Sequence, residues 1–398
     1  MSTPPNAHAA DRSIRLLALA AFVSGANLRI TDPLVPALAQ YFSASVSAAG
    51  SVVSGFTLGY ALFQVVHGPL GDRIGKLRAV TIGMFIAAAA SLACAVAPGL
   101  SSLALARFLT GMGAAAVIPL SLAFIGDNVG YERRQMVLGR FIGAVLSGQM
   151  IGPLIAGALS EVFSWRSVFV IMAGVFALVG LFLLPSAREL QTVVKGPRTH
   201  PLRQYLQLAR DPWVRTVVAA VAIEGFLFYG AFAYLGAYLK ARFDLNYFLI
   251  GLLIAGFSIG GIAYSMSVKW LVPRLRERGL CIGGGIALLA CFAGIALAPS
   301  WPAAVPFFIA SGFGFYMLHN TLQTRATEMA PAARGAAVSF FAFCLFAGQA
   351  AGAAAFGQAI DAIGYVPVIV SAGFVLLAVG WWFSRQLERH RRHTPQRA

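Results

Sequence analysis

Charged residues are scarce in this sequence. Asp, Glu, Lys and Arg make up 11% of its 398 residues, whereas hydrophobic residues make up 59%. Soluble domains carry roughly 25% charged residues. A chain of this length with so little charge cannot cover a surface that faces water, so lipid must be the solvent for most of its outside. The scarcity excludes a soluble globular protein and predicts an all-α integral membrane protein.

Acidic residues are scarcer than basic ones, with 14 Asp and Glu against 30 Lys and Arg and a net charge of +16. An excess of this size can indicate a nucleic-acid partner. Here the Lys and Arg residues lie in short gaps between apolar runs instead of along one amphipathic face. That pattern is typical of cytoplasmic loops that face anionic lipid headgroups, so we expect membrane lipid and no nucleic acid as a partner.

Paired cysteines and nucleotide-binding loops are missing. Cys94, Cys281, Cys291 and Cys344 all fall inside apolar runs, at spacings that predict neither a metal site nor a disulfide framework. The sequence has no G-x-x-x-x-G-K-S/T segment that would cradle a phosphate. We therefore expect no metal, no cofactor and no ATP drive, and no cluster typical of an enzyme.

Long apolar runs are what the sequence does have. A helix needs about 20 mostly apolar residues to cross a bilayer, and we predict twelve such spans. In chain order they cover 14–38, 46–70, 79–98, 101–125, 137–162, 166–184, 213–239, 247–271, 280–299, 302–325, 336–360 and 364–384.

The longest polar stretch separates six spans from six others. We therefore predict two six-helix bundles, at 1–184 and 213–384. A cytoplasmic central loop at 185–212 joins them, and a basic cytoplasmic tail follows at 385–398.

The basic residues also predict the orientation. If both termini are cytoplasmic, most of the 30 Lys and Arg lie on the cytoplasmic side, as the positive-inside rule requires. Arg166, Lys240 and Arg242 then lie outside. We interpret the first apolar run as an uncleaved span and not as a signal peptide, because Arg29, Asp32 and many further runs follow it. We expect a multi-pass protein of the inner (cytoplasmic) membrane.

The two halves are weak repeats of each other at an offset of about 200 residues. A run of matches at a nearly constant offset indicates two parallel repeats, an architecture that places a substrate site between the halves. The matched pairs in spans 5 and 11 are Gly148 and Gly348, Gly152 and Gly352, Gly157 and Gly357, and Glu161 and Asp361.

The loop between spans 2 and 3 reads GPLGDRIGKLR over residues 68–78. It resembles the signature loop of the major facilitator superfamily, G-x-L-x-D-R-x-G-R-K/R, and Gly75 permits a tight reversal there. The resemblance implies that Asp72 lies at the positive N-terminal end of span 11, near Arg334, and holds the outward-facing state. The residues of this expected cytoplasmic gate are Gly68, Asp72, Arg73, Gly75, Lys76 and Arg78. An ordinary charged loop is the alternative.

Span 4 carries an arginine within its apolar run, in the segment LALARFLTGMG at 103–113. The segment resembles the superfamily motif L-x-x-x-R-x-x-x-G-x-G, which implies that Arg107 takes part in proton coupling. A charge inside a span is costly and marks a functional candidate. The alternative is an arginine that extends to the membrane surface.

Span 5 carries Gly148, Gly152, Pro153 and Gly157. The segment resembles the G-x-x-x-G-P-x-x-G-G signature of the superfamily's twelve-span drug:proton antiporters, with Ala156 in place of one glycine. Glycines four residues apart clear a helix face for close packing, and proline bends the helix. The resemblance implies contact with span 8, for which we expect the glycines Gly256, Gly260 and Gly261. Generic packing of small residues is the alternative.

Span 1 holds a cluster of polar residues: Asn27, Arg29 and Asp32. The resemblance implies that spans 1, 4, 7 and 10 line a central cavity, so Arg107 is expected to approach Asp32. Arg29 also lies within pairing reach of Asp32. Our hypothesis is that Asp32 carries the coupled proton and that contact with an arginine opens and closes during transport. The alternative is a permanent ion pair that only fixes helix packing.

Two further titratable groups lie within predicted spans. Glu224 in span 7 is interpreted as a site for a substrate cation or a proton, or else as a hydrogen-bond acceptor for neighbouring helices. His319 in span 10 can titrate near neutral pH, or it is a packing residue. Asn320 adjoins it, and Met317 leaves a weak metal-transport alternative.

Aromatic residues on spans 7 and 10 complete the expected site. Walls of this kind suit amphipathic or lipophilic substrates, although such residues also pack helices. We expect the cavity to be lined by Phe228, Tyr229, Phe232 and Tyr316.

Together these features predict a proton-coupled antiporter that exports small amphipathic or lipophilic compounds by alternating access. The proton gradient is the expected driving force, a small molecule and protons are the expected partners, and the chain is expected to be a monomer. Export of a sugar, amino acid or other metabolite is the alternative, as is a facilitator without proton coupling.

Overall fold

The computed structural model describes residues 5–189, 201–330 and 334–393, and within these ranges it contains helices and no β-strand. The all-helical fold predicted from the sequence is therefore confirmed. The central loop and the tail lie in part outside the described residues, although α9 (Pro201–Leu208) lies in the predicted loop and the last helix continues to His393.

The first six spans correspond closely to the predicted runs, and two of them are interrupted. The elements are α1 (Pro5–Arg29), η1 (Asp32–Leu34) and α2 (Val35–Tyr41) in span 1; α3 (Val46–Ile74); α4 (Lys76–Ala95); α5 (Leu100–Ala114) and α6 (Val117–Asn128) in span 4; α7 (Tyr131–Val162); and α8 (Trp165–Glu189).

The second half follows the same order. Its elements are α10 (Pro212–Glu224), the π-helical turn η2 (Gly225–Tyr229), α11 (Gly230–Phe232) and α12 (Leu235–Phe243) in span 7; α13 (Tyr247–Leu297); α14 (Trp301–Glu328); α15 (Arg334–Ile363); and α16 (Tyr365–His393).

One of these elements accounts for two spans. Eleven helical segments of the described chain are long and apolar enough to cross a membrane, and α13 is the longest, with 51 residues. At 1.5 Å per residue it extends about 76 Å, more than twice a bilayer core of about 30 Å. Its backbone breaks at Arg276 (φ 52°, ψ 178°), so α13 supplies spans 8 and 9 and the total is twelve. The polar loop expected at 272–279 is a sharp reversal between two helices.

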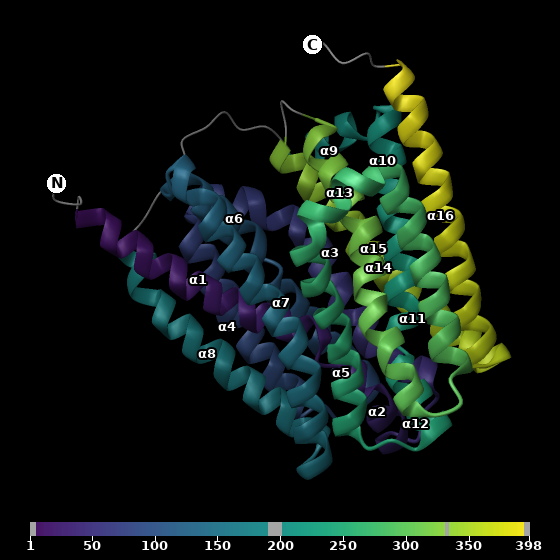
Figure 1. The fold of residues 1–398 in the computed structure, drawn as a ribbon. Helices are drawn as coiled ribbons and strands as arrows, with labels where there is room; N and C mark the ends of the chain where they lie inside the picture. Colours follow the sequence, from purple (N-terminus) through teal and green to yellow (C-terminus); the bar gives the residue numbers. More distant parts are fainter. Residues whose placement is uncertain (1–4, 190–200, 331–333, 394–398) are drawn as a thin grey trace.

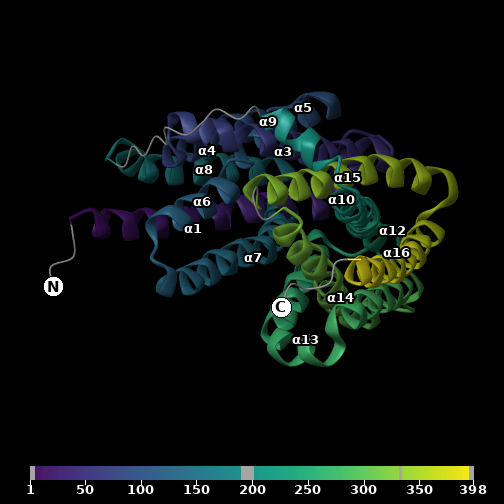
Figure 2. The same ribbon diagram turned by 90° about the horizontal axis from the view of Figure 1, so that it is seen from above.

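The helices form two groups that meet at one end of the molecule (Figure 1). Seen from above, the helices of the first half lie on one side of the molecule and α10 and α13–α16 lie on the other (Figure 2). Helix α1 begins and α16 ends at the end where the groups diverge, which we call the terminal side. At the other end, the opposite side, α2 and α12 are in contact.

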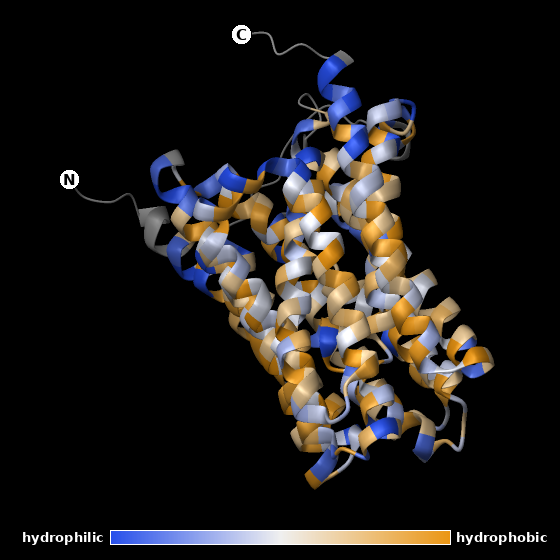
Figure 3. Cartoon of the chain, turned by 45° about the vertical axis from the view of Figure 1, so that its right-hand side comes forward, coloured by the Kyte–Doolittle hydropathy of each residue, from blue (hydrophilic) through white to orange (hydrophobic). Residues whose placement is uncertain are grey.

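Hydrophobic residues cover the lengths of the helices, and hydrophilic residues gather near their ends (Figure 3). This is the distribution expected of helices that cross a bilayer, because no water is available in the hydrocarbon core.

Glycines bring the spans into backbone contact in the same way in both halves. Helix α7 lies on α1 at Gly148 and Gly152, and a methyl group at Gly152 would lie 2.5 Å from the carbonyl oxygen of Ala26. Helix α15 lies on span 7 at the equivalent Gly348 and Gly352, where the nearest carbonyl carbons would be 2.9 and 2.8 Å away. The repeat seen in the sequence is thus a repeat of helix contacts.

Two seams join the halves, α7 with α13 and α3 with α15. Gly251 of α13 is the glycine that meets span 5, and a methyl group there would lie 3.0 Å from the carbonyl carbon of Pro153. The expectation that Gly256, Gly260 and Gly261 form this contact is wrong. They face α14, because residues five to ten positions along a helix point in other directions.

The α7–α13 seam is closed by hydrogen bonds on the opposite side. The backbone N–H of Tyr247, the first residue of α13, donates to Glu161 Oε2 at 2.8 Å. The Tyr247 hydroxyl and Gln40 Oε1 are 3.2 Å apart. A carboxylate of one half therefore caps the first turn of a helix in the other half, where the helix dipole favours negative charge.

A substitution at Arg276 tests the reversal in α13. Its backbone lies in a region that is essentially restricted to glycine and costs a non-glycine residue about 1–3 kcal/mol. The side chain is exposed, so R276G should raise the thermal stability of the purified protein. R276A keeps the backbone cost and should give no increase. A lower melting temperature for R276G would contradict the assignment.

A second substitution tests the closed seam. E161Q removes the charge that caps α13, which is worth about 1 kcal/mol, and should increase the population that is open on the opposite side. Spin labels at the exposed Phe163 and Ala241 report this as a longer distance between the halves. D361N is the matched control, because Asp361 is the repeat equivalent of Glu161 and forms no hydrogen bond within the described residues. Equal distances in wild type and E161Q would show that the cap does not hold the seam.

Candidate functional site

A buried ion pair lies where span 1 is interrupted. Helix α1 ends at Arg29 because Pro33 has no N–H to donate to the Arg29 carbonyl. The chain turns at Ile30–Thr31 and η1 begins at Asp32. Arg29 Nη1 then lies 3.4 Å from Asp32 Oδ2, and the residues are 5% and 0% exposed. The predicted proximity of Arg29 and Asp32 is thus present.

The second half completes this pair. The Arg29 guanidinium carbon lies 4.0 Å from the centroid of the Tyr229 ring and 5.6 Å from that of Phe232, distances at which a cation is attracted to an aromatic face. A methyl group at Gly236 would lie 2.7 Å from the Asp32 carbonyl oxygen. The ion pair therefore lies between the two halves, next to the side on which they meet.

Arg107 does not pair with Asp32. Its Nη1 donates to Asn27 Oδ1 at 2.9 Å and its Nη2 to the Asn27 carbonyl oxygen at 3.2 Å. Its guanidinium carbon lies 4.1 Å from the Phe56 ring centroid. The residue is completely buried, so it does not extend to the membrane surface. Arg107 instead ties span 4 to span 1 on both sides of Arg29, through Asn27 and, at 3.5 Å, the Thr31 hydroxyl.

Glu224 and His319, which were predicted as two separate candidates, form a second buried pair. Glu224 is the last residue of α10, at the start of the π-helical turn, and its Oε2 lies 2.8 Å from His319 Nδ1 on α14. Glu224 has no exposed surface. The imidazole stacks on Phe315, with centroids 4.9 Å apart and planes at 14°. Spans 7 and 10 are the repeat equivalents of spans 1 and 4, which hold Asn27 and Arg107. That symmetry was the available signal for the pair.

The carboxyl groups of Asp32 and Glu224 each have one oxygen without a partner. Asp32 Oδ1 and Glu224 Oε1 are buried and form no hydrogen bond within the described residues. Buried polar atoms are nearly always hydrogen-bonded, and exceptions call for an explanation. Each oxygen is a place where a proton can bind without displacing an existing partner.

The aromatic residues divide between the site and the core of the second half. Tyr229 lies at the site, over Arg29 and 5.2 Å from the Phe315 ring centroid, and Tyr316 lies beside His319 at 6.4 Å. Phe228 was expected to line a cavity, but it is completely buried among rings of α13 and α14. It packs the core because the π-helical turn directs its ring into the bundle.

Asn320 is not brought to either buried pair. Its side chain lies beside Tyr264 of α13, and its carbonyl oxygen accepts a hydrogen bond from Thr324 at 2.8 Å.

The signature loop on the terminal side makes a pair other than the one expected. Gly75 has the positive φ (93°) that the reversal requires, and α4 begins directly after it. Lys76, which is buried, then forms an ion pair with Asp127 at the end of α6. Asp72 is exposed and makes no ion pair within the described residues. Gly68, Arg73 and Arg78 also lie at this end of the molecule.

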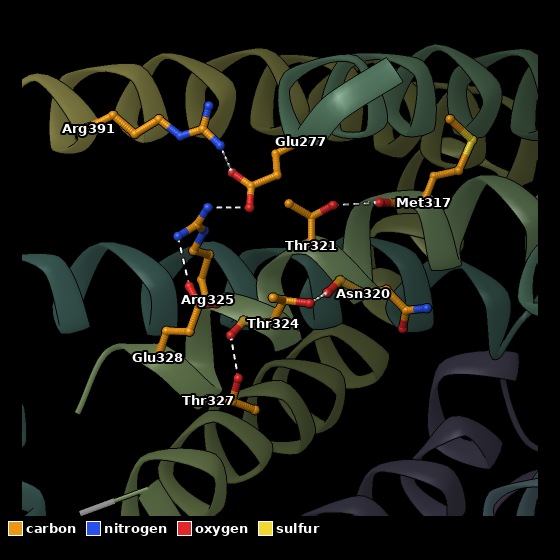
Figure 4. A network of polar contacts seen from close by, with 9 residues as sticks. All are labelled: Glu277, Met317, Asn320, Thr321, Thr324, Arg325, Thr327, Glu328 and Arg391. Atoms are coloured by element: carbon orange, nitrogen blue, oxygen red, sulfur yellow. Dashed lines mark hydrogen bonds and ion pairs between the residues drawn. The ribbon is translucent and has the colours of Figure 1, made fainter. Parts of the chain in front are cut away.

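The second half builds the equivalent reversal with the charges exchanged. Glu277 stands where Lys76 stands in the first half. Arg325, near the end of α14, binds one Glu277 oxygen, and Arg391 of α16 binds the other at 2.9 Å (Figure 4). Arg325 also binds Glu328 at 2.8 Å. This cluster was not predicted, because its residues lie on three helices and belong to no sequence motif.

Comparisons with known proteins agree with this architecture. The family model of the Major Facilitator Superfamily matches residues 17–353. The uncharacterized MFS-type transporter YceJ of Bacillus subtilis is 25% identical over 365 residues, which cover 89% of this chain and 92% of that protein. A lincomycin resistance protein of Streptomyces lincolnensis is 28% identical over 181 residues, covering 46% of this chain and 37% of that protein.

A solved structure shows the same fold. It is a bacterial homologue of the human lysosomal transporter Spinster, in an inward-facing and unoccupied conformation. The match has a TM-score of 0.76 and 18% sequence identity, and it covers 96% of this chain and 98% of the other.

The Arg107 contacts predict an effect on stability. N27A removes one hydrogen bond to a buried charge, which should destabilise the folded protein by about 2 kcal/mol. N27D keeps the acceptor oxygen and should retain most of the stability. The melting temperatures of both purified variants in detergent test this, and equal losses for N27A and N27D would contradict it.

Proposed function

We propose that this chain, which belongs to the major facilitator superfamily and is a membrane transporter, exports small amphipathic or lipophilic compounds in exchange for protons. The observation that carries the proposal is the buried Arg29–Asp32 pair between the two halves. Its arginine also contacts Tyr229 of the second half.

This position couples proton binding to movement. In alternating access the two halves move relative to each other about a fixed site. A movement that carries Tyr229 away from Arg29 removes an aromatic contact that holds the arginine beside Asp32. A proton on Asp32 removes the negative charge that attracts Arg29. Asp32 is therefore our candidate for the group that carries the coupled proton.

The packing of α7 supports antiport. Gly148 and Gly152 hold α7 against α1, the helix that ends at Arg29, and the bend-forming Pro153 meets α13 across the seam. Helix α7 therefore connects the seam to the helix that carries the ion pair, so a movement of α13 at the seam is transmitted to Arg29 and Asp32. Asp72, which makes no ion pair in this conformation, is our candidate for closing the terminal side in the other one.

The proposed orientation places the terminal side in the cytoplasm, because most basic residues lie in its loops. The proposed location is the inner membrane, and the proposed working unit is the monomer.

The proposed substrate class rests on the aromatic rings beside the ion pair. Tyr229 and Tyr316 offer apolar faces with polar tips, which suits an amphipathic compound, and one relative is described as a lincomycin resistance protein. Two buried arginines favour an anionic metabolite as the second candidate, because each can pair with a carboxylate.

The test uses the full chain in liposomes that contain a pH-sensitive dye, under an imposed proton gradient. Ethidium, lincomycin, benzoate and arabinose are added in turn. We expect one amphipathic compound to trigger proton movement in wild type, and D32N to lose at least nine-tenths of it. D361N, an exposed carboxylate substituted in the same way, should behave as wild type.

The outcomes separate the alternatives. A response to benzoate or arabinose alone would favour the metabolite exporter. Substrate flux without proton movement would favour a facilitator. Full coupling in D32N would remove Asp32 from the proton path.

A further inference from the structure

We propose that Glu224 is a second proton-binding site, separate from Asp32, and that His319 passes protons between Glu224 and water on the terminal side. This inference rests on the proposed function and adds a site and a direction of access to it.

The geometry makes His319 the partner through which Glu224 exchanges protons. Glu224 is completely buried, and within the described residues its hydrogen-bond partner is His319. The His319 side chain keeps 10% of its surface exposed. Stacking on Phe315 holds the imidazole in place. Nδ1 therefore stays beside the carboxylate, and Nε2 lies on the edge of the ring that faces away from it.

A polar face of α14 leads from His319 to the terminal side. Gln323 follows His319 by four residues and so lies on the same helix face, and both Gln323 and Thr324 are exposed. The hydroxyl groups of Thr324 and Thr327 continue the polar side of this helix toward its end (Figure 4). Polar residues on a membrane helix face protein or water and avoid lipid, so this face is the route by which water reaches His319.

The other groups around Glu224 leave the proton transfer to the histidine. Tyr229 lies on the adjoining turn, and Cys281 approaches from α13. Arg29 lies beyond Tyr229 on span 1, next to Asp32. On α15, the residue that faces the pair is the apolar Phe341, 5.6 Å from the imidazole. Among these groups, His319 is the one whose ring has an N–H on one nitrogen and a bare acceptor on the other, so it can take up a proton at one nitrogen and release one from the other.

The transfer balances on the imidazole. Nε2 accepts a proton from a hydronium ion, which becomes water, while Nδ1 gives its proton to Glu224 Oε2. The ring ends neutral with its proton on Nε2, and the carboxyl group ends protonated. Release of the Glu224 proton reverses both steps.

The two carboxyl groups then exchange protons with different sides of the membrane. Asp32 lies beside Gly236 and next to the closed seam, so the opposite side reaches it only after the seam opens. Glu224 communicates with the terminal side while that seam is closed. A proton that crosses the membrane would thus bind at Asp32 from one side and leave from Glu224 on the other, with Arg29 and Tyr229 between them.

Infrared spectroscopy tests this without a transport substrate. The purified full chain is subjected to a pH jump, and the carboxyl C=O stretching bands are followed in time. We expect wild type to show two buried carboxyl components, of which E224Q lacks one and D32N the other. H319N keeps a hydrogen bond to Glu224 through its amide but cannot relay a proton, so it should slow the Glu224 component at least tenfold without removing it.

Two results would overturn the inference: an E224Q difference spectrum identical to that of wild type, or a Glu224 component in H319N that responds at the wild-type rate. If H319N fails to give a wild-type melting temperature, H319Q is used in its place. The liposome assay with D32N remains an independent test of the proposed function. Loss of substrate-triggered proton movement there would not change the infrared assignment.

Discussion

Close approach of helix backbones through glycine is the constraint on which the rest of this structure depends. Lipid supplies no hydrophobic force between helices, so spans associate by van der Waals packing. Gly152 and Gly352 each admit a neighbouring carbonyl group where a methyl group would not fit. Because equivalent glycines in the two halves pack against equivalent spans, the contact pattern of one bundle is repeated in the other.

The polar residues of the candidate site lie where the helices are interrupted. The Arg29–Asp32 pair spans the turn at Ile30–Thr31, and Glu224 immediately precedes the π-helical turn of span 7. An interruption leaves backbone N–H and C=O groups without their helical partners and changes the directions of the side chains. Turns of π-helix are frequent at functional sites. The regular packing of α7 and α15 holds the interrupted spans 1 and 7 in place, so the rigid spans position the irregular ones.

The sequence was sufficient to predict the twelve spans, the two-fold repeat and the reversal at Gly75, because these depend on hydropathy and on local backbone preference. It was also sufficient to place Arg29 near Asp32, since residues three positions apart at the end of a helix stay close to each other.

The sequence did not predict that Glu224 meets His319, or that Arg107 bonds to Asn27 instead of Asp32. Residues about 80–100 positions apart meet only if both helices have the right rotation and depth, and hydropathy gives neither. Phe228 was misplaced for a related reason, because it lies within the π-helical turn, where side chains point in directions that a regular helix does not predict.

The reversal at Arg276 has a consequence for how the two halves relate to each other. The first half makes its turn with Gly75, which takes a positive φ without steric cost, and follows it with Lys76. The second half makes the same turn with Arg276 and follows it with Glu277. Glycine has been exchanged for arginine and a base for an acid, yet the path of the backbone and the presence of an ion pair at that point are kept. The two halves therefore share the backbone turn and an ion pair beside it, and not the residues that form them. A search for the sequence motif consequently finds only the first of the two turns.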